Sequence, residues 1–235
     1  MPPHVQMIMN HISPLPDPDD AAPSLAAQMY DTLRMRLITG QFVPGHAFST
    51  RTLASELGVS QMPVRDALSR LAAEGAVEIR SKRRITVPAM TRVRYDDLMR
   101  CRMLLEPATA VAALPHIDVG LLDALREIDR GIDTALASGA VNDYMVGNFR
   151  FHFLLYRAGP APTSIRMIEM LWAQFGPFMR AIYGRCDTSA LIDRHQEAIH
   201  AIASRDAQAL HHAISEDIAD GMRLIQADGL DDALC

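Results

Sequence analysis

The stretch from Phe48 to Pro88 constrains the fold more than any other part of this sequence, because it contains two short helical patterns, a tight turn between them and a hairpin pattern. Ser49 is a typical N-cap residue, and Gly58 suits the left-handed position that follows a helix. Ser60 and Pro63 then begin the second helix. Two helices joined by a short glycine-containing turn predict a helix-turn-helix, whose second helix can enter the major groove of DNA.

The residues after the second helix predict a small β-hairpin with a cationic tip. Apolar residues alternate on both sides of Ser81-Lys82-Arg83-Arg84, namely Val77, Ile79, Ile85 and Val87. A hairpin at this place is typical of the wing of a winged helix. Upstream, the range 24–39 predicts another helix with apolar residues facing inward: Leu25, Met29, Leu33 and Ile38.

This stretch resembles the GntR superfamily of transcription regulators. The resemblance rests on the run Leu53-Ala54…Leu57-Gly58-Val59-Ser60…Pro63-Val64-Arg65-Asp66-Ala67-Leu68, preceded by matching residues from Tyr30 to Gly45. Wings of this family usually carry glycine near the tip, where Arg83 and Arg84 stand here. The arginines imply a wing that either approaches the minor groove less closely or binds phosphate more strongly.

The resemblance implies a set of DNA-contacting residues at the start of the second helix, at the start of the helix before it and on the wing. The set is Arg51, Ser60, Gln61, Met62, Arg65, Arg80, Lys82, Arg83 and Arg84. Arg65 lies one helical turn after Gln61, so both can face the groove, where Arg can hold guanine and Gln can hold adenine. The alternative is that the wing residues are solvated surface charges.

The charge distribution agrees with a DNA-binding module attached to another domain. The whole chain has a net charge of −5, but residues 24–88 contain nine Lys and Arg against five Asp and Glu. Residues 1–22, with five prolines, predict a disordered tail, and residues 23–88 predict the winged helix-turn-helix. Residues 89–97 read as a linker or helix start. From 98 to 230 the pattern predicts an all-α bundle of about six helices of 15–22 residues, with no β-type alternation.

The second part of the chain resembles the FCD ligand-binding domain of the FadR subfamily. The matching residues are Arg102-x-x-Leu105-Glu106, Asn148-x-x-Phe151-His152 and Arg194-His195 with the apolar run to Asp206. Metal-binding FCD domains use Asp or Asn, a His four residues later and two further His. By this spacing the implied ligands are Asn148, His152, His195 and Asp217, a set that suits Zn²⁺, Ni²⁺ or Mn²⁺. The alternative is that the histidines are ordinary core residues or bind an effector carboxylate directly.

Arg102 has two possible partners. One is Glu106, four residues later on the same helix, and the other is an anionic effector that would match the planar guanidinium fork. Arg150 and Trp172 are further candidates for an effector pocket. No stretch approaches the length of a membrane span, no secretory signal is evident, and three widely spaced cysteines fit a reducing cytoplasm.

Together these features predict a mainly α, cytoplasmic, DNA-binding transcription regulator, most readily a repressor. It is expected to act as a homodimer on a palindromic double-stranded operator and to bind a small carboxylate effector, with a divalent metal as a possible cofactor. Two alternatives remain: a regulator that responds to the metal alone, and a metal-dependent hydrolase with an attached DNA-binding module. The sequence contains no P-loop, GxSxG or strand-associated GxGxxG, so an enzyme is not expected.

Overall fold

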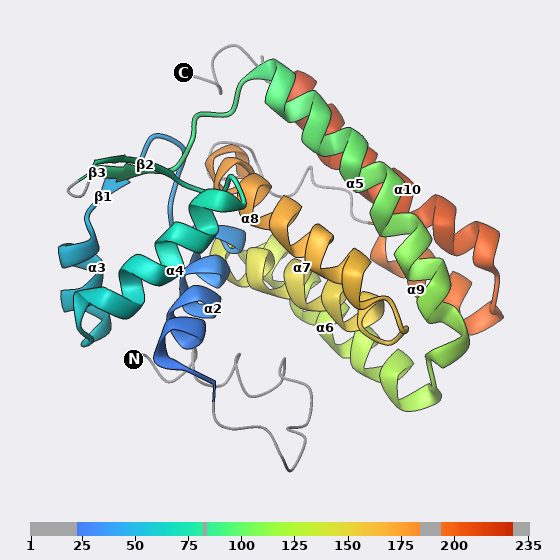
Figure 1. Ribbon diagram of the computed structural model, residues 1–235. Coiled ribbons are helices and arrows are strands. Elements are labelled where there is room, and N and C mark those ends of the chain that lie inside the picture. Colours follow the sequence, from blue (N-terminus) through green and yellow to red (C-terminus); the bar gives the residue numbers. More distant parts are fainter. Residues whose placement is uncertain (1–22, 82–83, 184–193, 228–235) are drawn as a thin grey trace.

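The computed structural model describes residues 23–81, 84–183 and 194–227, with side chains described up to residue 220. The chain folds into an N-terminal unit with a small sheet and a larger helical unit (Figure 1). The elements, in order, are α2 (Leu25–Ile38), β1 (Ala47–Phe48), α3 (Thr50–Leu57), α4 (Gln61–Ala73), β2 (Glu78–Ser81), β3 (Arg84–Thr86), α5 (Arg92–Ala113), the 3₁₀ turn η1 (Leu114–His116), α6 (Val119–Ser138), α7 (Val141–Tyr156), α8 (Pro162–Tyr183), α9 (His195–Ser204) and α10 (Ala207–Ala227).

The N-terminal unit is a winged helix-turn-helix, as the sequence predicts. The Ser49 hydroxyl accepts a hydrogen bond from the Thr52 N–H at 3.0 Å and so begins α3, and Gly58 ends that helix with φ of 68°. Ser60 occupies the N-cap position of α4, but its side chain makes no cap hydrogen bond. The predicted hairpin forms as β2 and β3, and β1 adds a third antiparallel strand in the order β1-β3-β2.

Two apolar residues that the sequence places inside are exposed. Leu25 is 46% exposed, and it is the first residue of α2. Ile79 is 45% exposed because β2 is the edge strand and all four of its residues face solvent. The rest of the predicted apolar set forms the core of this unit, including Leu33, Ile38 and Ile85.

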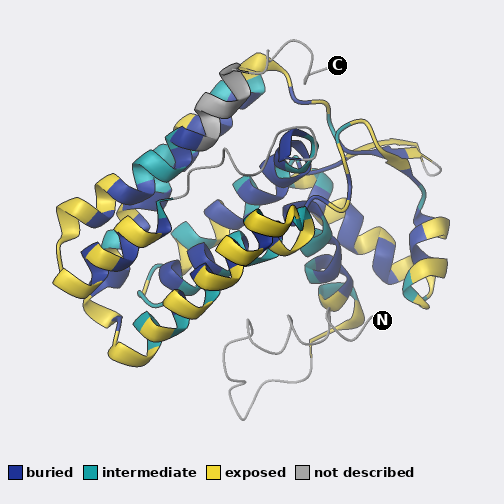
Figure 2. Cartoon of the chain, turned by 180° about the vertical axis from the view of Figure 1, so that it is seen from behind, coloured by how far each residue is buried: buried dark blue, intermediate teal, exposed yellow. Residues whose placement is uncertain are grey.

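The C-terminal unit is the expected all-α bundle, built from α5 to α10 among the described residues (Figure 1). Five of these helices have 16 to 22 residues, and α9 is shorter, with 10. Gly139 ends α6 in the left-handed conformation, and Arg205 adopts the same conformation at the break before α10. The sequence also predicts a helix break near Cys186-Asp187-Thr188, which lies outside the described residues. The buried residues lie on the helix faces that point toward one another (Figure 2).

The two units pack directly on each other through α2 and α8. A side chain at Gly176 would place its Cβ 2.3 Å from the carbonyl oxygen of Ile38, so only glycine allows α8 to approach the end of α2 this closely. The Glu169 carboxylate on α8 forms ion pairs with Arg34 of α2 and with Arg157, the latter at 2.6 Å. Arg94 bridges the units further by donating to the Gly75 carbonyl and to Gln174.

Among the described helices, none is both long enough and apolar enough to cross a membrane.

Candidate functional site

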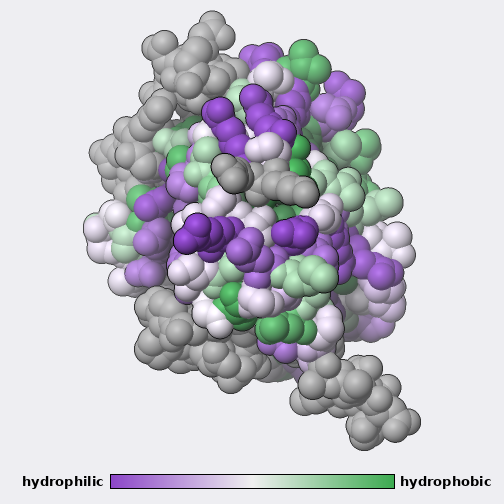
Figure 3. Space-filling model, turned by 60° about the vertical axis from the view of Figure 1, so that its left-hand side comes forward, coloured by the Kyte–Doolittle hydropathy of each residue, from purple (hydrophilic) through white to green (hydrophobic). Residues whose placement is uncertain are grey.

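The predicted DNA-contacting residues of the two helices all lie on the surface of the winged helix-turn-helix. Arg51 is on the first turn of α3, and Ser60, Gln61, Met62 and Arg65 lie at the start of α4; all five are exposed, with Met62 at 66%. Hydrophilic side chains gather in patches on this side of the molecule (Figure 3). An exposed helix N-terminus with an arginine one turn in has the geometry that a recognition helix needs.

Of the four cationic residues predicted on the wing, the structure describes Arg80 and Arg84. Arg80 forms an ion pair with Glu78 of the same strand at 3.1 Å, whereas Arg84 is exposed at the start of β3. Lys82 and Arg83 lie outside the described residues.

The helical unit contains a buried cluster of two histidines and one aspartate. His152 comes from α7, His195 is the first residue of α9, and Asp217 comes from α10. The Nε2 atoms of the histidines are 3.4 Å apart, and the Asp217 carboxylate lies 3.2 Å from Nε2 of His152 and 4.0 Å from Nε2 of His195. The three ligand atoms all lie within 4.8 Å of one another, so three distant segments converge on one point.

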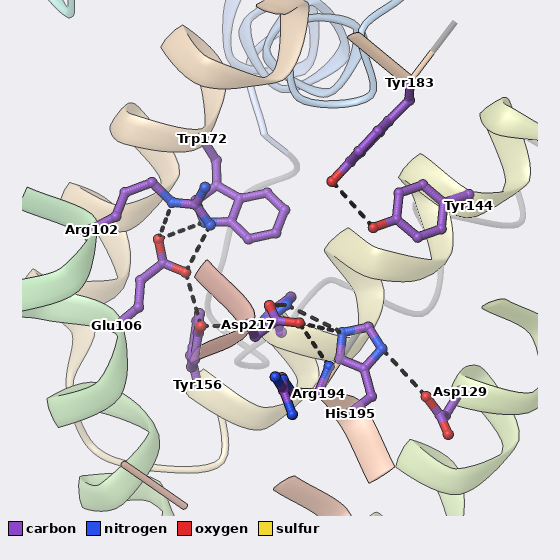
Figure 4. A network of polar contacts seen from close by, with 11 residues as sticks. Arg102, Glu106, Asp129, Tyr144, Tyr156, Trp172, Tyr183, Arg194, His195 and Asp217 are labelled. Carbon is purple, nitrogen blue, oxygen red and sulfur yellow. Dashed lines mark hydrogen bonds and ion pairs between the residues drawn. The ribbon is translucent and has the colours of Figure 1, made fainter. Parts of the chain in front are cut away.

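A buried chain of hydrogen bonds fixes the orientation of His152. Its Nδ1 lies 3.0 Å from the Tyr156 hydroxyl. That hydroxyl donates to the Glu106 carboxylate at 2.9 Å (Figure 4). Burial and the neighbouring Glu106 carboxylate raise the pKa of Tyr156 well above its usual value, so the hydroxyl keeps its proton. Because that proton goes to Glu106, Nδ1 of His152 must be the donor to the tyrosine oxygen, and the other ring nitrogen, Nε2, faces the cluster.

Asp129 lies beside Nδ1 of His195, as Tyr156 lies beside Nδ1 of His152. Its carboxylate is fully buried on α6 and faces Nδ1 of His195 at 3.3 Å (Figure 4). The second carboxylate oxygen of Asp129 accepts from Gln196. The contact with His195 is a close charge contact rather than an aligned hydrogen bond. A carboxylate on this side favours a proton on Nδ1 and leaves Nε2 of His195 directed at His152 and Asp217.

The electrostatics keep Asp217 ionised. Burial alone would raise the pKa of its carboxyl, but the hydrogen bond with His152 and the nearby His152 and His195 outweigh burial and hold the pKa well below its usual range. The Arg194 backbone N–H also donates to this carboxylate at 3.1 Å. The cluster therefore brings two imidazole Nε2 atoms and one carboxylate to the same place.

This donor set fits a divalent transition-metal ion. Two nitrogen ligands at about 2.0–2.1 Å from a tetrahedral zinc ion lie about 3.3 Å from each other, which is close to the 3.4 Å between the two Nε2 atoms. Each histidine also has a second partner on its other ring nitrogen, as metal-binding histidines almost always do. The fit rests on three residues, His152, His195 and Asp217.

Two further residues of α7 were predicted to take part: Asn148 as a metal ligand and Arg150 as an effector contact. Asn148 lies one turn before His152 on α7 and is half-buried, so helical geometry puts it on the same face of the helix. Arg150 is also half-buried but lies two residues from His152, which places it on the opposite side of α7. The structure therefore does not bring Arg150 toward the cluster.

Arg102 is paired with Glu106, which was one of its two predicted partners. Its Nε and Nη2 atoms meet the two Glu106 oxygens at 2.5 and 3.3 Å, and its guanidinium stacks over Trp172 and Phe175, 4.9 Å from each ring centroid. Trp172 in turn donates to Glu106 at 3.0 Å, so it belongs to this network rather than to an open pocket wall (Figure 4). Any anion that binds Arg102 must compete with a buried carboxylate.

Sequence reasoning missed Asp129 and Tyr156. Asp129 had a signal: it interrupts the apolar stripe of α6 between Leu125 and Ile132, whose side chains are both fully buried. A lone acidic residue on such a face needs a buried partner. Tyr156 follows His152 by four residues on the same helix face, but nothing in the sequence identifies Glu106 as its second partner.

Comparison with known proteins agrees with this two-unit structure. Residues 25–87 match the model of "Bacterial regulatory proteins, gntR family", and residues 97–220 match that of the "FCD domain". The regulator McbR of Escherichia coli is 28% identical over 196 residues, which cover 82% of this chain and 89% of McbR. The structure of E. coli McbR/YncC superimposes with a TM-score of 0.83 at 26% identity, covering 88% of this chain and all of that one. The gluconate operon transcriptional repressor of Bacillus subtilis is 24% identical over 80% of this chain and 79% of its own length.

The fold and these similarities define a bacterial DNA-binding regulator with a helical C-terminal domain. The chain belongs to the gntR family of bacterial regulatory proteins and carries an FCD domain after its winged helix-turn-helix. The relatives are transcription regulators, which confirms the expectation of a regulator rather than an enzyme, and the metal-dependent hydrolase is not supported.

Proposed function

We propose that this regulator is a repressor that binds a palindromic operator as a homodimer and senses a small carboxylate through a divalent metal in its FCD domain. The observation that carries the proposal is the convergence of His152, His195 and Asp217 inside a helical domain that packs on a DNA-binding domain. The proposed DNA contacts are the exposed residues of α3, α4 and the wing, with Arg65 as the principal reader of bases.

His152, His195 and Asp217 would hold the ion, and Asn148 is proposed as a further ligand because it shares the face of α7 that carries His152. A divalent ion held there would supply a Lewis-acidic point for an effector carboxylate oxygen. The protein's own part is to hold the two Nε2 lone pairs in place, which Tyr156 and Asp129 do from the far side of each ring.

Contacts in the structure connect the cluster to the DNA-binding unit. His152 contacts Tyr156, Tyr156 contacts Glu106, and Glu106 accepts from Trp172 on α8. The same helix carries Glu169, which pairs with Arg34 of α2. An effector that changes the position of α8 would therefore shift the population between two placements of the recognition helices.

A regulator that responds to the metal alone remains a second candidate, because the three ligands need no organic molecule to converge. Metal titration against operator affinity, without any carboxylate, separates the two candidates.

The test combines metal analysis with DNA binding. Elemental analysis of the untagged protein should find about one metal ion per chain, lost in His152→Ala and in His195→Ala. Fluorescence anisotropy on a duplex selected by the protein from a random pool should then show an affinity that changes when carboxylates are added to the metal-loaded wild type. Absence of metal after reconstitution, or an affinity that no carboxylate changes, would contradict the proposal.

A further inference from the structure

The outer face of α5 carries an ordered stripe of exposed side chains. Helix α5 runs along the edge of the helical unit beside α10 (Figure 1). Val93 is 80% exposed and Leu104 is 69% exposed. The side chains of Asp97 and Arg100, between them, are each 70% exposed and form an ion pair with each other at 3.6 Å. Successive members are four, three and four residues apart, so at about 100° per residue all four lie within a band of roughly 60° on the helix surface.

Two exposed apolar residues on one helix face are unusual in this chain. The other large exposed apolar side chains of the described residues each lie on a different element: Leu25, Val43, Met62, Ile79, Val119 and Met167. Single exposed apolar residues are common on protein surfaces. A stripe with an exposed apolar residue at each end, on one helix face, indicates a contact surface.

The stripe is complementary to itself when its direction is reversed. Read along α5 it runs apolar, acidic, basic, apolar. A second copy laid antiparallel, with a two-fold axis midway between Asp97 and Arg100, places Val93 opposite the partner's Leu104 and Asp97 opposite the partner's Arg100. The two-fold axis repeats both contacts, which gives two ion pairs flanked by two apolar contacts.

We propose that this stripe, formed by Val93, Asp97, Arg100 and Leu104, is where two copies of the chain associate, with their α5 helices antiparallel. The inference rests on the proposed dimeric regulator and specifies its surface. The charges select the orientation, because a parallel arrangement would put Asp97 against the partner's Asp97 and Arg100 against the partner's Arg100. The four-three-four spacing is also that of a helix-packing seam, in which side chains of facing helices interlock.

The proposal is tested by reversing the charges. Asp97→Arg places Arg opposite the partner's Arg100 twice in each dimer, and Arg100→Asp does the same with two acids. Each single variant should raise the dimer dissociation constant by about 10-fold or more, because like charges across an interface are strongly repulsive and symmetry doubles the effect. The double variant Asp97→Arg/Arg100→Asp restores both pairs and should return the dissociation constant toward the wild-type value. Sedimentation velocity over a concentration series measures all four proteins.

A matched control lies on α6. Asp123 and Arg126 form an exposed ion pair at the same three-residue spacing, with 2.8 Å between Oδ1 and Nη1. Asp123→Arg should leave the dimer unchanged, and circular dichroism should show that every variant is folded. The proposal is wrong if the wild type is monomeric, if the single variants associate like the wild type, or if the double variant stays dissociated. Operator binding by the wild type, measured separately, shows whether the regulatory function stands when the interface does not.

Discussion

The sharpest test of the cluster of His152, His195 and Asp217 is to remove one nearby hydroxyl that contacts none of the atoms proposed to bind the metal. Tyr156→Phe deletes the oxygen that accepts from Nδ1 of His152 and donates to Glu106. His152 is only 1% exposed and Glu106 is fully buried, so water cannot readily replace the lost partner of either group. The phenylalanine ring would occupy the same space as the tyrosine ring, and the change is therefore almost purely one of hydrogen bonding.

The expected effect on metal binding follows from the role of this hydroxyl. Without it, His152 loses the contact that fixes both its ring orientation and the proton on Nδ1. Loss of such a second partner costs about 10–100-fold in metal affinity, or about 1.4–2.7 kcal/mol. The metal-free protein should also lose about 1–3 kcal/mol of unfolding free energy, because buried polar groups are left without a partner.

The assay is competition for Zn²⁺ between the protein and a chromophoric chelator, alongside chemical denaturation of the metal-free protein. Tyr144→Phe is the matched control: Tyr144 is a buried tyrosine of the same helix, and its hydroxyl contacts the Tyr183 hydroxyl at 3.4 Å. It should bind zinc like the wild type. If Tyr156→Phe also keeps wild-type zinc affinity while folded, the argument that this hydroxyl orients His152 is refuted.

Three further predictions concern other parts of the chain. Asp129→Asn should lower zinc affinity roughly 10-fold, because a neutral amide holds the Nδ1 proton of His195 less strongly; the same chelator competition measures it. Arg65→Ala should weaken binding to a selected operator duplex by about 1–3 kcal/mol without changing thermal stability, and Arg126→Ala on the exposed face of α6 should leave DNA affinity unchanged in anisotropy. Glu169→Gln should lower the unfolding free energy by about 1–3 kcal/mol in denaturant titration, because Arg34 and Arg157 share this carboxylate; a variant as stable as the wild type would show that the ion pairs of Glu169 contribute little.

Local signals in the sequence explain most of what could be predicted of the DNA-binding unit. Ser49 and Gly58 mark the two ends of α3 through contacts within a few residues, so sequence spacing alone identifies them. Strand β1 could not be found in this way. Ala47 and Phe48 are too few for a periodic pattern, and they form a strand only because β3 lies beside them.

The candidate metal cluster was predictable only in part. The resemblance identified His152, His195 and Asp217, which the structure brings together. The contacts of Asp129 and Tyr156, the residues beside the two histidines, depend on helix packing. Asp129 contacts Gln196, 67 residues away in the sequence, and Tyr156 contacts Glu106, 50 residues away. No spacing rule predicts such pairs, because they depend on how α5, α6 and α7 pack.

The pairing of Arg102 changes what the effector is expected to contact. From the sequence alone, a free guanidinium in a helical bundle suggested an anion site, with Glu106 as the competing partner. In the structure the Glu106 carboxylate is fully buried and accepts from three side chains: Arg102, Trp172 and Tyr156. An effector carboxylate that displaced it would leave a buried negative charge with fewer partners, which is strongly unfavourable. An effector that binds at the His152, His195 and Asp217 cluster would avoid this cost. Because Glu106 contacts Tyr156, Trp172 and Arg102, a shift of Tyr156 on effector binding would reach Arg102 through Glu106, without a direct contact between Arg102 and the effector.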